Sequence, residues 1–127
     1  MMIIVGGHPA VNSEPQVAFV RDFAEIEKTR PNSLVVMQFA REKMEGFKSC
    51  GVPLALAVSS LTQFVYAMNL GAKYALCSKE LAPMLQKAAD NYVSDTRVLA
   101  LIDSEEEIEW AALEEIDGVF FANLLER

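Results

Sequence analysis

The apolar runs LALAV (54–58), YALC (74–77) and VLALI (98–102) decide the fold class of this chain. Each run is short and almost continuously apolar, which is typical of a strand buried on both faces. The stretches between the later runs are about 12 to 20 residues long, enough for a crossover helix between parallel strands. The sequence therefore predicts an α/β fold with a mostly parallel sheet of five to six strands. Three more runs of the same kind complete the set: Met1–Val5, Leu34–Phe39 and Val119–Phe121.

Five amphipathic stretches are expected to form the crossover helices. The first begins near Pro15, with Ser13 as its N-cap. The third begins at Ser60 and the fifth at Ser104, each with a Gln or Glu three residues later, the spacing of a capping box. The second ends at Gly51, and the fourth contains Pro83 in its first turn. Apolar residues at helical spacing mark the first of these helices: Phe19, Val20, Phe23 and Ile26.

A chain of 127 residues fits a single domain, residues 1–127, with helices and sheet in three layers. Two arrangements satisfy the pattern. The preferred one is an open, doubly wound, flavodoxin-like sheet with helices on both faces. The alternative is a curved array of sequential strands, part of a (βα) barrel. Because a complete barrel of that kind has eight strands, six strands favour the open sheet.

Composition and charge exclude several classes of partner. Apolar residues make up 52% of the chain, but no apolar run approaches the roughly 18 residues of a membrane helix. Residues 101–127 carry nine acidic and one basic side chain, a net charge of −8, whereas residues 1–100 have a net charge of +1. We therefore expect no nucleic-acid partner and no membrane association. With no export signal at the N-terminus, the sequence predicts a cytoplasmic protein.

No cofactor or metal site is expected. The chain has one histidine and two cysteines, Cys50 and Cys77, which cannot form a conventional zinc site. Gly6-Gly7 follows the first strand, but no dinucleotide fingerprint and no phosphate-binding P-loop follows it. No motif names a reaction, so the sequence leaves open whether the protein is an enzyme.

The carboxyl ends of the expected strands are the candidate site, because ligands of parallel sheets bind there. Small polar residues at these ends leave helix N-terminal amides open to a phosphate or carboxylate, and Lys79 supplies a counter-charge. The competing interpretation is that the serines and Asp103 only cap their helices. We expect an anion between the third and fourth strand ends, near Lys79, because Glu105–Glu107 would repel it from the fifth helix. The predicted ligand-binding residues are Gly7, His8, Ser59, Ser60, Ser78, Lys79 and Asp103.

Two of these residues are also candidates for catalysis. The imidazole of His8 titrates near neutral pH and suits general acid–base chemistry. Asp103 is an acidic residue at the same end of the sheet, where it would orient His8 or bind a hydroxyl group. Cys77 ends a buried strand and is expected to be a small core residue.

Two families resemble the chain in layout. Response-regulator receivers share its length and alternation, but they need acidic residues where this chain has Gly6-Gly7-His8 and a phosphorylatable Asp where it has Ser59-Ser60. That difference argues against phosphotransfer signalling. The segment from Pro53 to Phe121 is similar to part of a phosphate-binding (βα) barrel in its turns GAKY (71–74) and IDGV (116–119).

Two functions from different classes follow from these observations. The first is binding of a small ligand that carries a phosphate or carboxylate group. The second is a non-catalytic interaction or assembly protein that uses the fold as a scaffold. For either function a symmetric homodimer is expected, formed away from the acidic fifth helix.

Overall fold

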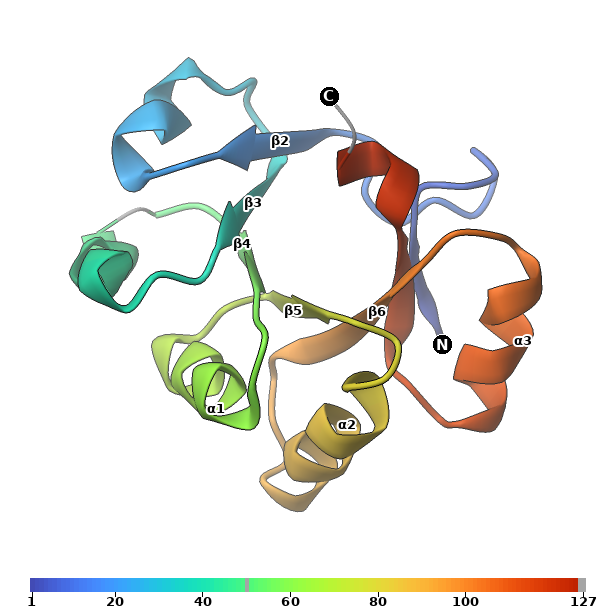
Figure 1. Cartoon of the computed structure of the whole chain (residues 1–127). Coiled ribbons are helices and arrows are strands. Elements are labelled where there is room, and N and C mark those ends of the chain that lie inside the picture. The colour runs from blue at the N-terminus through green and yellow to red at the C-terminus, as the bar shows by residue number, and fades with distance from the viewer. Residues whose placement is uncertain (50, 126–127) are drawn as a thin grey trace.

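Within residues 1–49 and 51–125, which the computed structural model describes, seven strands form one all-parallel sheet that curls around a central axis (Figure 1). From edge to edge the strand order is β1-β7-β6-β5-β4-β3-β2, so neighbours from β2 to β7 are consecutive in the chain. All six expected runs are strands. The strands are β1 (Ile3–Val5), β2 (Val17–Val20), β3 (Leu34–Gln38), β4 (Leu54–Ala57), β5 (Tyr74–Cys77), β6 (Arg97–Ile102) and β7 (Gly118–Phe121).

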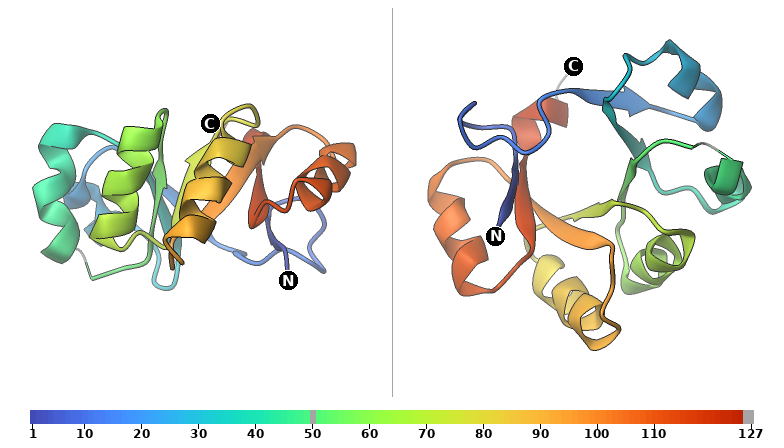
Figure 2. Two further views of the ribbon diagram at one scale, coloured as in Figure 1. Left: turned by 90° about the horizontal axis from the view of Figure 1, so that it is seen from below. Right: turned by 180° about the vertical axis from the view of Figure 1, so that it is seen from behind.

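Five of the six connections between strands contain a helix, and these helices lie around the outside of the curled sheet (Figure 2). The connection from β1 to β2 has no helix. No helix in the described part of the chain combines the length and the apolar character needed to cross a membrane. The α-helices are α1 (Leu61–Leu70), α2 (Ala82–Asn91) and α3 (Glu106–Leu113), and the 3-10 helices are η1 (Phe23–Lys28), η2 (Arg41–Ser49) and η3 (Ala122–Leu125).

The expected flavodoxin-like arrangement, with five to six strands in three layers, is wrong. A doubly wound sheet places helices on both faces because its strand order reverses part-way along the chain. Here the order does not reverse between β2 and β7, so each right-handed crossover places its helix on the same face. The curved array of sequential strands, the alternative interpretation, describes this sheet better.

Apolar side chains fill both sides of the sheet. The inner face encloses one cluster, in which Phe19 of β2 meets Phe120 of β7 edge to face, with ring centroids 6.5 Å apart. The outer face packs against the helices in a second, larger cluster that includes Leu56, Phe64 and Leu85. The strands from β3 to β7 are thus largely buried on both faces, as their apolar runs predict, whereas β1 and β2 at the edges of the sheet are mostly half-buried. The buried inner residues are Val5, Leu34, Val36, Ala55, Tyr74, Leu76, Leu99 and Phe120.

The expected first helix is also wrong, because Val17–Val20 is a strand. Ser13 does not cap a helix there. Its amide donates to the carbonyl of Ile4 (2.7 Å), and its hydroxyl accepts from the Ile4 amide (3.2 Å). Asn12 accepts from the amide of Gly6 (3.1 Å). The loop between β1 and β2 therefore supplies hydrogen-bond partners for backbone groups on the outer edge of β1, where no strand pairs with it.

The helix boundaries around α1 are confirmed. Ser60 is its N-cap and accepts a hydrogen bond from the amide of Gln63 (3.1 Å). Gly71 ends it in the left-handed region, with φ of 81°, where a side chain would add strain. The other helices occupy the expected stretches with shorter bounds, and η2 buries Met44 and Phe47 as expected. Cys50 and the last two residues of the expected terminal turn lie outside the described residues.

Candidate functional site

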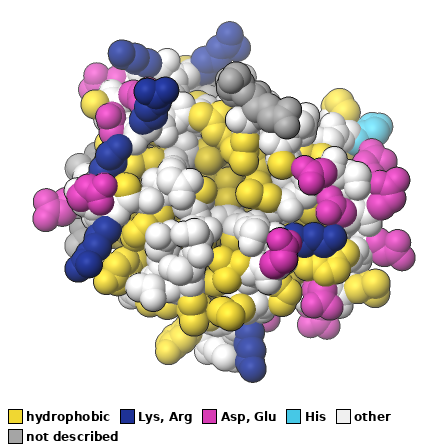
Figure 3. Space-filling model, viewed as in Figure 1, with side chains coloured by type: hydrophobic (Ala, Val, Ile, Leu, Met, Phe, Trp, Pro, Cys, Tyr) yellow, Lys and Arg dark blue, Asp and Glu magenta, His cyan; other side chains and the backbone are white. Residues whose placement is uncertain are grey.

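The carboxyl ends of the strands form one surface, the strand-end face, which is turned toward the viewer in Figures 1 and 3. Its centre is apolar, because four inner side chains are only partly buried there: Phe19, Ala57, Leu101 and Leu124. Figure 3 shows hydrophobic side chains at the centre, acidic side chains toward α3, and Lys and Arg toward η1 and η2. Inner side chains of the sheet thus reach solvent at this end.

Polar residues follow four neighbouring strands around this centre. Gln38 ends β3 and donates from Nε2 to the carbonyl of Ala57 (3.3 Å). Ser59, Ser78 and Asp103 follow β4, β5 and β6, and all three are exposed. These strands are adjacent in the sheet. The structure therefore brings the predicted site residues that follow β4, β5 and β6 onto one face.

The serines of this face form hydrogen bonds in the turns where α1 and α2 begin. Ser60 caps α1, and Gln63 Oε1 accepts from the amide of Ser59 (2.9 Å). Ser78 Oγ accepts from the amide of Leu81 (3.3 Å), just before α2. The capping interpretation is therefore confirmed for Ser60, but the N-cap positions of α2 and α3 are Leu81 and Glu105, without a side-chain cap bond, so the expected N-cap at Ser104 is wrong. Ligand binding by Ser59, Ser60 and Ser78 remains a prediction.

Lys79 is held by two residues of α3. Its Nζ lies 3.2 Å from Glu107 Oε1 and 5.0 Å from the centre of the Trp110 ring. Glu107 Oε2 accepts from the amides of Asp103 (2.6 Å) and Ser104 (3.1 Å). The hydrogen bond from the Asp103 amide is the largest cause that lowers the pKa of Glu107, and the Ser104 amide and Lys79 lower it further, against a smaller effect of burial. One carboxylate of the chain therefore occupies the donors that an anion would use at β6.

Gly7 and His8 lie in the loop that follows β1. Gly7 has φ of +67°, and a Cβ there would meet the ring of Phe121 at 2.7 Å, so its place requires glycine for packing. His8 is exposed, and its Nδ1 accepts from the amide of Ala10 (3.0 Å). In the described part of the chain neither residue forms a hydrogen bond or an ion pair with Lys79 or Asp103, so a single site that includes all four residues stays a prediction.

Other reactive groups are buried or dispersed. Cys77 is 1% exposed, and burial raises its thiol pKa to about 12. Among the described residues, no group of three or more His, Cys, Asp or Glu side chains is placed to hold a metal ion.

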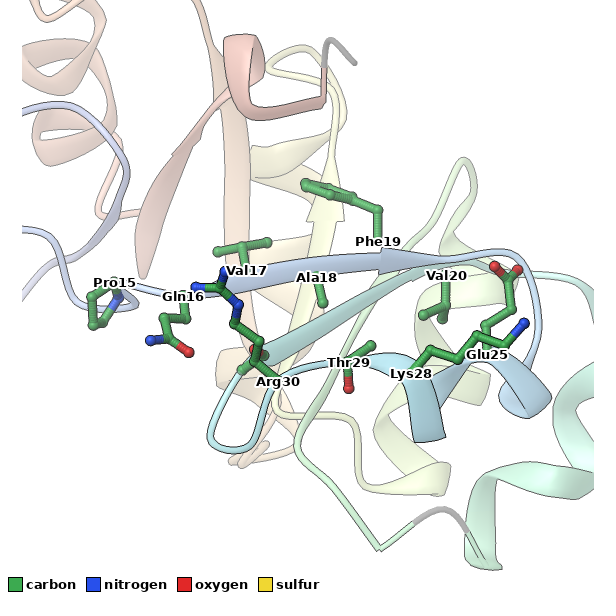
Figure 4. A pocket seen from close by; sticks show the side chains of 11 residues that line it. Pro15, Gln16, Val17, Ala18, Phe19, Val20, Glu25, Lys28, Thr29 and Arg30 are labelled. Atoms are coloured by element: carbon green, nitrogen blue, oxygen red, sulfur yellow. The ribbon is translucent and has the colours of Figure 1, made fainter.

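A groove of about 560 Å³ runs along β2 beside η1 (Figure 4). Ala18 and Val20 point toward it, while Val17 and Phe19 point to the other side of the strand. Glu25, Lys28 and Arg30 line its wall. The groove exists because the β1–β2 connection has no helix to cover this part of β2.

Sequence reasoning missed the apolar centre of the strand-end face. The helical spacing of Phe19, Val20, Phe23 and Ile26 predicts a helix and so hides Phe19 as a strand residue. Lys79 and Glu107 are 28 residues apart, and this spacing carries no signal of their contact. The pairing of Ser104 with Glu107 at capping-box spacing was the one available signal that Glu107 accepts from nearby amides.

Comparison of the sequence with protein-family models and with curated proteins finds no match.

Proposed function

We propose that the strand-end face binds a small organic ligand that carries a phosphate or carboxylate group. The observation that carries the proposal is the apolar centre at this end of the sheet, with polar groups from β3, β4, β5 and β6 around it. Ligand sites in general combine an apolar surface with a few polar groups that fix orientation. Parallel strands of this kind commonly bind ligands at their carboxyl ends.

The anionic group of the ligand would interact with Lys79 beside Ser78. Lys79 is only partly exposed and already pairs with Glu107, which itself accepts from two amides. An incoming phosphate or carboxylate would therefore share these donors with Glu107 or replace it. We expect modest affinity for simple anions and higher affinity for ligands whose organic part covers Leu101 and Ala57.

His8 and Asp103 remain the proposed polar groups for a hydroxyl or a transferable proton of that ligand. Asp103 is exposed at the end of β6, next to the amide that donates to Glu107. We assign no reaction to these residues.

A thermal-shift screen with phosphorylated and carboxylated metabolites tests the proposal. A ligand at 100 times its dissociation constant adds about 2.7 kcal/mol to stability, which such a screen detects. Lys79→Ala should weaken binding of a hit about tenfold or more. Lys87→Ala is the matched control, because Lys87 is an exposed lysine on α2 and should leave binding unchanged. Equal effects of the two variants, or no hit, would argue against the proposal.

The second candidate function, a non-catalytic assembly protein, is favoured by the internal hydrogen bonds at the starts of α1 and α3. At these two helix starts the amides of Ser59 and Asp103, which would hold an anion, already donate to side-chain oxygens of Gln63 and Glu107, and Ser60 Oγ accepts from the amide of Gln63. An assembly protein would need these bonds only for stability and would use another surface for its partner.

A further inference from the structure

The surface of α1 carries no charge. From Ser49 to Ala72 the sequence contains no Asp, Glu, Lys, Arg or His, although 23% of the chain is charged. α1 nevertheless lies on the outside of the sheet, between η2 and α2 (Figure 2). An outer helix without charge is unusual for a surface that faces only water, and charged residues are depleted where proteins bury a shared interface.

Large apolar side chains are exposed on this helix. Leu61 is 40% exposed and Tyr66 42% exposed, and Val65 and Met68 are partly exposed between α1 and its neighbours. The ring of Tyr66 packs against Phe39, with ring centroids 6.0 Å apart. Tyr66 is thus an aromatic side chain with one face supported by the core, a common anchor of protein interfaces.

Two grooves run along the sides of α1, and their outer rims carry opposite charges. The groove toward η2, about 340 Å³, is lined by Arg41, Met44 and Tyr66. The groove toward α2, about 540 Å³, is lined by Met68, Tyr92 and Asp95. Arg41 and Asp95 are both exposed.

We infer that α1 and its two grooves form the contact of a symmetric homodimer. Arg41 follows β3 at the strand-end face, whereas Asp95 precedes β6 at the opposite end of the sheet, so the two residues lie diagonally across α1. A twofold axis that crosses α1 obliquely, perpendicular to the line from Arg41 to Asp95, places Arg41 of each copy opposite Asp95 of the other. The charges of the two rims favour a second copy as the occupant, because the same surface then meets each rim with a residue of opposite charge. With no charge on α1, the axis brings no like charges together, although each copy carries a net charge of −7.

Sedimentation velocity of the whole chain, from low to high micromolar concentration, tests this inference. The wild type should approach twice the mass of one chain as concentration rises. Tyr66→Glu should remain a monomer with an unchanged circular dichroism spectrum. Leu113→Glu is the matched control, because Leu113 is an apolar residue on α3, 76% exposed, and the variant should dimerise like the wild type.

A charge exchange tests the orientation. Arg41→Asp and Asp95→Arg should each weaken the dimer about tenfold, and the double variant should recover most of that loss. A wild type that stays monomeric at high micromolar concentration would overturn the inference, as would a dimer that Tyr66→Glu leaves intact. A double variant weaker than either single one would overturn the pairing of Arg41 with Asp95. None of these results depends on ligand binding at the strand-end face.

Discussion

The carboxylate of Glu107 joins the ends of two neighbouring strands: Oε1 lies 3.2 Å from Lys79 Nζ, beyond β5, and Oε2 accepts from the Asp103 amide, at the end of β6. This arrangement fixes Lys79 over Trp110 on the strand-end face. It also means that the cation expected to bind a ligand already has an internal partner.

Replacing Glu107 should change stability in a pH-dependent way. Its pKa is lowered in the folded protein, so its ionised form stabilises the fold at neutral pH, and this contribution is lost as pH falls through the lowered value. Glu107→Gln should therefore be less stable than the wild type in urea at neutral pH, and the difference should shrink below about pH 4. Glu106→Gln, an exposed residue of the same turn, is the control. A difference that stays constant with pH would contradict the role of the Glu107 charge.

The hydroxyl of Tyr74 should stabilise the opposite end of the sheet. It lies 2.7 Å from Glu14 Oε2, which is also 2.8 Å from Lys73 Nζ, and Tyr74 is only 4% exposed. Burial first, and then the hydrogen bond and charge of Glu14, raise the pKa of Tyr74, so this phenol stays protonated and donates. Tyr74→Phe should cost about 2 kcal/mol in urea unfolding. Tyr92→Phe should cost little because Tyr92 is 76% exposed, and equal losses would show that the hydrogen bond does not matter.

Charges introduced into two strands should have different effects. Leu56 is fully buried on the outer face of the sheet, so Leu56→Asp leaves an unpaired charge in the core and should abolish soluble expression. Leu101 is only partly buried on the strand-end face, so Leu101→Asp should remain folded with reduced stability. The yield of soluble protein and its thermal unfolding distinguish the two variants. If Leu101→Asp fails to fold while Leu56→Asp folds, the assignment of inner and outer faces is wrong.

Cys77 should be unreactive while the protein is folded. Its thiol is buried, with a pKa raised to about 12, so very little thiolate exists near neutral pH. In a Cys50→Ser background, an aromatic disulfide reagent should label Cys77 only after urea unfolds the chain. Labelling at the rate of a free thiol in native buffer would contradict its burial.

The strands were predictable except for one. Val17–Val20 holds two valines and a phenylalanine in four residues, a composition typical of strands. However, Phe19, Val20, Phe23 and Ile26 also fit a helical spacing, and Pro15 suits the first turn of a helix. Local sequence does not separate these interpretations, because pairing with β3 decides between them.

The curl of the sheet was not predictable from the apolar runs. An open sheet covered by helices on both faces buries each strand twice, and a curled sheet does the same with helices outside and its own side chains inside. Leu56 and Ala55, which lie on opposite faces of the sheet, would therefore both be buried in either arrangement. Only the strand order, which depends on contacts between distant segments, separates them.

The position of the candidate site in the fold was predictable from the sequence, but the contacts between its side chains were not. Ser59, Ser78 and Asp103 follow their strands as expected, since the carboxyl ends of parallel strands lie at one end of a sheet. The contact of Lys79 with Glu107 depends on how α2 and α3 pack, which residue spacing does not encode.

The strand-end face is tested most directly by amide chemical shifts recorded during titration with glycerol 3-phosphate, a small molecule with both a phosphate and an organic part. We expect saturable shifts at Gln38, Ser59, Ser78 and Asp103, which Lys79→Ala weakens and Lys87→Ala leaves unchanged. Shifts confined to the β2–η1 groove or to α1, or no saturable shift with this compound or with hits of the thermal-shift screen, would contradict this expectation.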